Sequence, residues 1–175
     1  MTKIIDGKKI SQRLKDNLKI EIDEIKNTFK RVPGLAVVQV GDVAASSVYV
    51  KAKTKAAKEV GIIVFDHHLD ALTTQSDLLH LIDELNKNED VNGILVQLPL
   101  PTNINEQIIL DSIHPNKDAD GFHPLNVGKL SISNSNNENL LIPCTPLGCL
   151  IMLQYEGIDL SGKNAVIIGR SNIVG

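Results

Sequence analysis

The sequence has few aromatic residues and no apolar run long enough to cross a membrane. Tryptophan is absent, and the two tyrosines and three phenylalanines make up 3% of the 175 residues. A membrane-spanning helix needs about 20 consecutive apolar residues, and no segment approaches that length. The first ten residues, MTKIIDGKKI, also lack the apolar stretch of a signal peptide. These absences predict a cytoplasmic protein with no membrane partner.

Cysteine is scarce, and so is clustered positive charge. Cys144 and Cys149 are too few for a disulfide framework and match no zinc spacing with the five histidines. His67 and His68 are adjacent in a predicted strand and would point to opposite faces, so they cannot chelate one ion together. We therefore expect reduced thiols and no metal. The net charge of −3, without a basic tract, argues against a nucleic-acid partner.

Apolar residues follow two alternating periods along the first 113 residues. Helical spacing predicts helices over 8–29, 46–60, 75–88 and 105–113, and short apolar runs predict strands over 35–41, 62–68 and 91–98. Such alternation is typical of βαβ units. It predicts an α/β fold with three layers, in which helices cover both faces of a parallel sheet. Ligands of these sheets bind beyond the carboxyl ends of the strands, here near residues 41–42 and 97–101.

The last third of the chain predicts the start of a second domain. The polar segment 131–140 favours a loop, and 143–157 a connecting helix. Residues 164–168 are typical of a strand that enters a glycine turn, as in the first strand of a Rossmann-like domain. We therefore expect a catalytic domain over 1–145 and an incomplete NAD(P)-binding domain over 146–175.

One lysine of the predicted helix 46–60 is unusually placed. At about 100° per residue, Lys53 shares a face with Ser46 and Tyr49, and this face should pack against protein. Lys51, Lys55 and Lys58 fall on the other side or at its edge, where solvation explains them. A lysine on a packed face extends to solvent, pairs or lines a cavity. In a cavity, desolvation would lower its pKa and suit it to proton transfer. Spacing alone favours the first of these alternatives.

Tyr49 and Lys53 also match the Y-x-x-x-K pair of short-chain dehydrogenases. Those enzymes place a glycine-rich cofactor loop before the tyrosine, whereas the glycine turn of this chain, at Gly169, follows it. The order of motifs therefore disfavours that family.

The segment VQLPLP (96–101) ends a predicted strand with a glutamine and two prolines. The amide of Gln97 can donate and accept hydrogen bonds at the edge of the sheet. Pro99 and Pro101 favour a rigid turn, and the sequence does not define the isomer of the bonds before them. A purely structural turn explains the prolines better than it explains the glutamine.

The segment NKDADGFHP (116–124) places Asp118, Asp120 and Gly121 in a turn. A calcium loop aligned on Gly121 would need a glutamate where Val127 stands, which excludes calcium. The alternatives are a solvated turn and a carboxylate that accepts hydrogen bonds from a planar heterocycle.

The segment GRSNIVG (169–175) lacks the second glycine of G-x-G-x-x-G, since Ser171 stands there. The strand predicted before it favours a dinucleotide loop. Arg170 would suit a 2′-phosphate and hence NADP rather than NAD. A tight turn in another fold remains the alternative.

Five motifs together resemble one family, and they occur in the same order along almost the whole chain. They are VGDVAASSVYVKAKTKAAKEVGI, GILVQLPLP, KDADGFHPLNVG, PCTPLGC and GKNAVIIGRSNIVG. The chain thereby resembles the bifunctional methylenetetrahydrofolate dehydrogenase/methenyltetrahydrofolate cyclohydrolases. The resemblance implies NADP-dependent oxidation of 5,10-methylenetetrahydrofolate and hydrolysis of the methenyl product to 10-formyltetrahydrofolate, in one-carbon metabolism.

The resemblance also assigns roles to individual residues. It makes Lys53 the proton-transfer residue and Gln97 its hydrogen-bonding partner, and it lays Tyr49 along the aminobenzoyl ring of the folate. It places Asp120 at the pterin, with Ser46 and Pro99 as further residues of the substrate site. The residues that match the cofactor loop are Gly169, Arg170, Ser171 and Ile173. No metal is implied.

Members of that family continue for about another hundred residues, the scale of a further domain. Two expectations therefore stand side by side: the bifunctional folate enzyme, and an inactive or cyclohydrolase-only fragment that binds folate weakly. Family members are homodimers, and the sequence does not fix the assembly of this chain.

Overall fold

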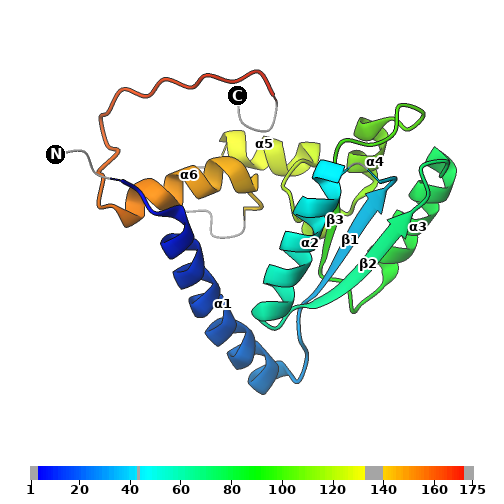
Figure 1. The fold of residues 1–175 in the computed structure, drawn as a ribbon, viewed down its shortest axis with the longest axis horizontal. Helices are drawn as coiled ribbons and strands as arrows, with labels where there is room; N and C mark the ends of the chain where they lie inside the picture. Colours follow the sequence, from blue (N-terminus) through cyan, green and yellow to red (C-terminus); the bar gives the residue numbers. More distant parts are fainter. Residues whose placement is uncertain (1–3, 43, 133–139, 172–175) are drawn as a thin grey trace.

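The computed structural model describes residues 4–42, 44–132 and 140–171, and its centre is a parallel sheet (Figure 1). The strands are β1 (Gly34–Val40), β2 (Ile63–Leu69) and β3 (Gly93–Val96), in the order β2-β1-β3. In their register, Leu35 of β1 lies opposite Val64 on one side and Gly93 on the other. The predicted α/β fold with a parallel sheet is confirmed.

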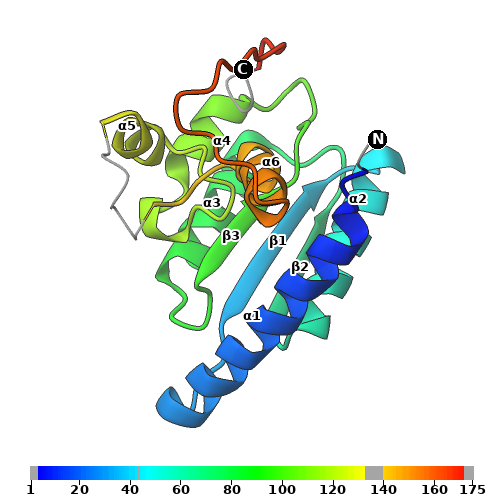
Figure 2. The same cartoon turned by 90° about the vertical axis from the view of Figure 1, so that its left-hand side faces the viewer.

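Helices cover both faces of this sheet (Figure 2). They are α1 (Gly7–Phe29), α2 (Ala44–Glu59), α3 (Gln75–Lys87), α4 (Glu106–Ser112), α5 (Pro124–Ile132) and α6 (Cys144–Tyr155), with a 3-10 turn at Pro115–Lys117. α2 packs on β1 and β2, and α1 contacts both α2 and α6. α3 and α4 pack together on the opposite face.

The main core lies between the sheet and the α3–α4 layer. Alternate residues of β1 point into it, together with β3 and the apolar stripe of α3; its fully buried members include Ala36, Val38, Leu78, Ile82, Val91, Ile94 and Ile109. Val37 is also buried, on the α2 side. β1 is therefore an apolar run rather than an alternating one, because both of its faces are covered.

Side-chain caps explain where several helices begin. Asp6 accepts a hydrogen bond from the Lys9 amide at the start of α1, and Asn105 does the same for the Ile108 amide in α4. Thr74 and Asp77 form a reciprocal capping box at the start of α3. Each cap satisfies an amide that has no partner within its helix, and this fixes the first turn.

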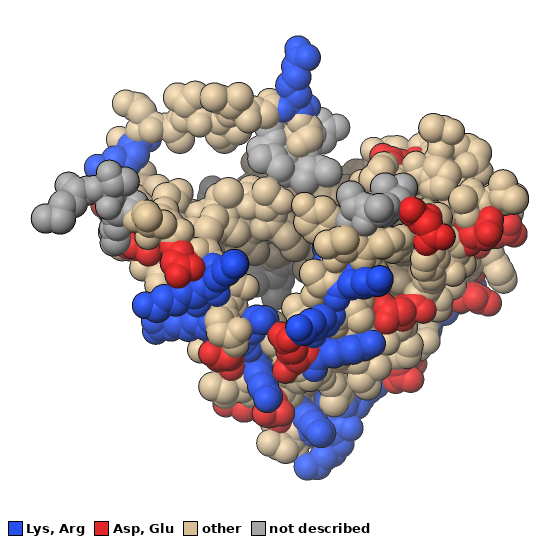
Figure 3. Space-filling model, in the orientation of Figure 1, with Lys and Arg blue, Asp and Glu red and all other residues tan. Residues whose placement is uncertain are grey.

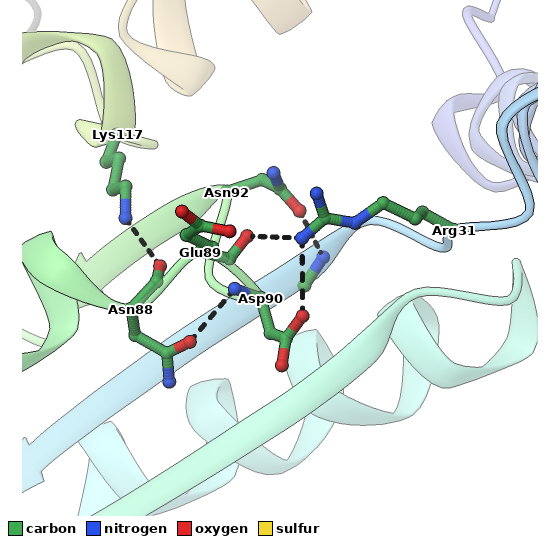
Figure 4. Close-up of polar contacts among 7 residues, drawn as sticks. Arg31, Asn88, Glu89, Asp90, Asn92 and Lys117 are labelled. Atoms are coloured by element: carbon green, nitrogen blue, oxygen red, sulfur yellow. Dashed lines mark hydrogen bonds and ion pairs between the residues drawn. The ribbon is translucent and has the colours of Figure 1, made fainter.

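A polar cluster fixes the turn between α3 and β3 at the amino-terminal end of the sheet (Figure 4). The Arg31 guanidinium donates to the Glu89 carbonyl at 3.1 Å and lies 3.4 Å from the Asp90 carboxylate. Asn92 accepts from the Gly34 amide at 2.9 Å, and Lys117 Nζ donates to the Asn88 carbonyl at 2.8 Å. The cluster joins the starts of β1 and β3 to the 3-10 turn.

Three expectations need correction. The strand predicted over 91–98 is shorter, and α5 was not predicted. Residues 164–168 do not form a strand: Val166 and Ile168 are 87% and 97% exposed, and no strand among the described residues pairs with this segment. An apolar run becomes a strand only where a neighbour takes its backbone hydrogen bonds. Of the predicted loop 131–140, residues 131–132 end α5, and 133–139 lie outside the described residues.

No helix in the described ranges combines the length and apolarity that a membrane crossing requires.

The buried centre of β3 gives a test of the fold. Ile94 is fully buried between α3 and the loop at Asp118, so Ile94→Ala should lower the free energy of unfolding by about 2–5 kcal/mol. Chemical denaturation followed by circular dichroism measures this change. Ile20→Ala is the matched control, because Ile20 is 60% exposed on α1. Equal losses in the two variants would contradict the core described here.

Candidate functional site

The carboxyl ends of β1 and β3 bring two of the predicted site residues together. Lys53 Nζ, on α2, donates a hydrogen bond to Gln97 Oε1 at 3.1 Å. Gln97 follows β3 directly, and its backbone N–H donates to the Val38 carbonyl of β1. The Gln97 side-chain Nε2 donates to the Leu98 carbonyl at 2.7 Å. The oxygen and the nitrogen of the Gln97 side-chain amide thus both form hydrogen bonds, and the oxygen points toward Lys53.

The turn between β1 and α2 determines where Lys53 lies. Gly41 has a φ of +73°, a conformation that favours glycine. The buried Gln39 side chain donates to both the Gly41 carbonyl and Ser47 Oγ at 2.9 Å. Ser46 is buried beside this junction. These contacts fix the first turn of α2 to the end of β1, and the helix then carries Lys53 to Gln97.

The other lysines of α2 lie in solvent. Lys51, Lys55 and Lys58 are exposed, as the helical wheel predicted, and Lys58 pairs with Asp66 at 3.5 Å. Figure 3 shows Lys and Arg side chains gathered over α1 and α2. Lys53, in contrast, is half-buried. The sequence analysis therefore separated the one inward-facing lysine from its neighbours correctly.

Tyr49 is the exception on that face. It was expected to pack against protein but is 63% exposed, and Val48 next to it is also exposed. An alanine-rich helix face can be exposed or can contact a core with the same composition, so the wheel could not distinguish the two. Tyr49 presents its ring to solvent one helical turn before Lys53.

Asp120 completes the cluster and lies in its electrostatic field. Burial raises the pKa of the Asp120 carboxyl, the positive charge of Lys53 lowers that pKa, and the negative charge of Asp118 raises it further. Desolvation is the largest of these effects. A carboxyl of raised pKa close to a lysine can exchange protons or hydrogen-bond a polar heterocycle.

Cys144 is a residue that the sequence analysis did not place at the site. Burial raises the pKa of its thiol, Asp120 adds to that rise and Lys53 opposes it, so all three groups interact. The residue nevertheless keeps exposed surface. It begins α6, and the only sequence signal was its position in the PCTPLGC motif.

A cavity lies between the loop that follows β3 and the start of α5. It encloses about 620 Å³, and its lining includes Leu98, Phe122 and Pro143. Leu98 follows Gln97 and Phe122 lies two residues after Asp120 in the chain, but Lys53, Gln97 and Asp120 themselves are not among the lining residues. Pro99 is exposed at its edge, and the Leu98–Pro99 peptide bond is cis. A larger cavity of about 870 Å³, between α2 and β2, includes none of the site residues named above.

The cofactor role expected for residues 169–171 stays a prediction, and Ser171 lines the cavity of about 620 Å³. Gly169, Arg170 and Ser171 are exposed, and no strand precedes them. Ile173 lies outside the described residues. In the described ranges, no group of three or more His, Cys, Asp or Glu residues is arranged to hold a metal.

The raised pKa of Asp120 gives a pH-dependent prediction. The folded state binds the Asp120 proton more tightly than the unfolded chain, so this group stabilises the fold below its unfolded pKa. That stability is lost as the pH rises through the folded pKa. Asp120→Asn should therefore melt a few degrees above the parent at about pH 7.5, and the difference should vanish near pH ~3.5.

Thermal unfolding across this pH range measures the effect. Asp23→Asn, on the exposed surface of α1, is the matched control and should follow the parent at every pH. A pH-independent difference for Asp120→Asn would show that its carboxyl does not carry the raised pKa.

Comparison with known families matches nearly the whole chain. Residues 5–120 match the catalytic domain of tetrahydrofolate dehydrogenase/cyclohydrolase, and residues 143–175 match the NAD(P)-binding domain of the same family. The bifunctional protein FolD of Magnetococcus marinus is 50% identical over 175 residues, which are all of this chain and 60% of that protein. FolD 2 of Arabidopsis thaliana is 50% identical over 173 residues, 99% of this chain and 57% of that protein.

Solved structures have the same fold. The FolD dehydrogenase/cyclohydrolase of Campylobacter jejuni superposes with a TM-score of 0.93 at 48% identity, covering 99% of this chain and 60% of that one. The Trypanosoma brucei FolD, solved with NADP cofactor and an inhibitor, gives a TM-score of 0.94 at 35% identity, with 99% and 58% coverage. The chain thus spans about 60% of the length of these relatives, for example 60% of the Magnetococcus marinus protein. From its catalytic-domain match over residues 5–120, the chain belongs to the tetrahydrofolate dehydrogenase/cyclohydrolase family.

Proposed function

We propose that this chain carries the folate site of a methylenetetrahydrofolate dehydrogenase/cyclohydrolase and that Lys53 transfers protons in it. The observation that carries the proposal is the 3.1 Å hydrogen bond from Lys53 Nζ to Gln97 Oε1. This contact holds a half-buried amine at the carboxyl end of the sheet, where ligands of α/β folds bind. Family membership and the identity of 50% to proteins named bifunctional FolD support the substrate class.

The hydrolytic reaction suits an amine at this position. The methenyl carbon of 5,10-methenyltetrahydrofolate is cationic, so water adds to it once a base accepts one of the water protons. We assign the acceptance of that proton to the Lys53 amine. The proton then passes to N5 as the bond from N5 to the carbon breaks, which leaves the formyl group on N10. The second water proton leaves to solvent, and the amine is regenerated.

Gln97 and Asp120 would orient the reactants. The Gln97 oxygen accepts one N–H of Lys53 and so directs the rest of the amine. Asp120, whose pKa burial raises, would hydrogen-bond the polar edge of the pterin. The exposed ring of Tyr49 offers a surface for the aminobenzoyl group, and Ser46 and Pro99 border the site. Holding both reactants in line is a large part of such catalysis.

The oxidative reaction needs a hydride acceptor, and we propose NADP for the protein because residues 143–175 match the family's NAD(P)-binding domain. The relative from Trypanosoma brucei was solved with NADP. Since Gly169–Ser171 form no cradle here, only hydrolysis is derived from the geometry. A chain with hydrolysis alone, or with weak folate binding alone, is the alternative. The family resemblance further supports a cytoplasmic homodimer and a catalytic domain over residues 1–145.

Replacing the proposed proton-transfer residue tests this function. Lys53→Met keeps the length of the side chain and removes the amine, so methenyltetrahydrofolate hydrolysis should fall at least about 100-fold. The loss of the near-ultraviolet absorbance of the methenyl substrate measures the rate. Lys51→Met is the matched control, because Lys51 is an exposed lysine on the other side of the same helix and should leave the rate unchanged.

The possible outcomes separate the alternatives. Full activity of Lys53→Met would refute the assigned role. Parent protein that only reproduces the uncatalysed rate would favour the fragment that merely binds folate. Tight binding of NADP⁺ in a fluorescence titration would support dehydrogenase activity in addition to hydrolysis.

A further inference from the structure

We propose that Asp118 is a positioning residue, which fixes Asp120 relative to β3 and to Lys53 and supplies a buried negative charge beside it. The inference rests on the proposed function, since it takes Asp120 to be the group that meets the pterin. It goes beyond that function because no role in the site has so far been given to Asp118.

The burial of Asp118 is the first argument. Asp118 is 2% exposed, although aspartate is almost never fully buried without partners. An exposed Asp–Gly turn needs no such carboxylate at its start. Its burial therefore calls for an explanation in terms of what it holds.

The partners of Asp118 supply that explanation. Its Oδ1 accepts from the Gly121 amide at 3.0 Å, and its Oδ2 accepts from the His123 amide at 2.8 Å and from Asn126 Nδ2 at 2.9 Å. All three donors follow it within eight residues. One carboxylate thus closes the segment that contains Asp120 and ties it to the first turn of α5.

The backbone of the same loop is joined to the strand that leads to Gln97. Asp118 forms a parallel bridge with Ile94 of β3, and the Ala119 amide donates to the Ile94 carbonyl at 3.2 Å. Both neighbours of Asp120 are therefore held by hydrogen bonds. The Ala119 amide is bonded to Ile94 of β3, and the Gly121 amide is bonded to the Asp118 carboxylate. Because Gln97 is three residues beyond Ile94, the same strand sets the places of both site residues.

Gly121 restricts the loop further. It has a φ of +71°, and a Cβ atom at this position would lie 2.7 Å from the Leu141 carbonyl oxygen. The loop thus has one tight arrangement, in which the Asp118 carboxylate takes the Gly121 amide.

The charge of Asp118 acts on the site as well. Groups from three parts of the chain face Asp120: Lys53 on α2, Asp118 in its own loop and Cys144 at the start of α6. Asp118 raises the pKa of Asp120, whereas Lys53 lowers it. Asp118 therefore opposes the lysine and helps Asp120 to keep its proton.

Two substitutions separate the charge of Asp118 from its geometry. Asp118→Asn keeps the size of the side chain but removes its charge and one of its two acceptor oxygens, so the midpoint at which Asp120 titrates should move to lower pH and the loop should be held less firmly. Asp118→Glu keeps the charge but displaces the carboxylate, so that midpoint should stay raised. Both should raise the KM for methenyltetrahydrofolate about tenfold or more, with a smaller change in kcat, because the pterin contact is misplaced.

NMR titration of the Asp120 carboxyl carbon in the ligand-free 175-residue chain is the primary measurement, with Asp120→Asn to assign the signal. This titration needs no activity, so it tests Asp118 even if the chain hydrolyses nothing. Asp23→Asn, on exposed α1, is the control and should not shift the midpoint. An Asp118→Asn protein with an unchanged Asp120 midpoint and an unchanged KM would overturn the proposal.

Hydrogen exchange in the unmutated chain covers the case in which neither variant folds. The Gly121 and His123 amides should exchange slowly, since both donate to the buried carboxylate. Exchange of these two amides at the rate of an open loop would also overturn the proposal.

Discussion

The site depends on the pairing of β3 along both of its edges. On one edge β3 pairs with β1, and on the other Ile94 bridges to Asp118. The first pairing places Gln97 next to the end of β1, from which α2 carries Lys53. The second places the Asp118–Gly121 turn beside the same strand. A strand of four residues therefore aligns a lysine, an amide and a carboxylate that come from distant parts of the sequence.

The polar groups of the site work against the stability of the fold. Most charged side chains of the described surface lie where water solvates them, as Lys51 and Lys58 do. Lys53 and Asp120, in contrast, are partly removed from water, and desolvation is the largest effect on Asp120. Such burial penalises charge, and the penalty is offset by opposite charge and by hydrogen bonds. For Asp120 the result is a carboxyl whose pKa lies above that of a solvated aspartate.

Much of the fold followed from periodicity in the sequence. The four helices and three strands of the first 113 residues were placed correctly to within a few residues, because their apolar stripes and caps are strong local signals. The strand predicted over 164–168 was wrong, since strand formation depends on a neighbour that a local pattern does not contain. α5 was missed because the polar Asp–Gly turn before it is typical of a loop.

The site was predictable in part. The wheel separated Lys53 from the other lysines of its helix, although spacing alone favoured a side chain that extends to solvent rather than one that pairs. A glutamine in an apolar run drew attention to Gln97. Their hydrogen bond, however, joins residues 44 positions apart, and no local spacing encodes it. Tyr49 was placed on a packed face yet is exposed. Cys144 was overlooked because the effect of Asp120 and Lys53 on its thiol arises only in the fold. The roles taken from the family resemblance stay proposals.

The close approach of Leu141 to Gly121 has a consequence for how the two halves of the chain communicate. The Leu141 carbonyl passes so near that only a hydrogen atom fits at the Gly121 α-carbon, and α6 begins three residues later with Cys144. Any movement of the α6 segment away from the first domain would therefore loosen the turn that carries Asp120. The absence of a side chain at position 121 thus allows the segment before α6 to pack directly against the loop of the first domain.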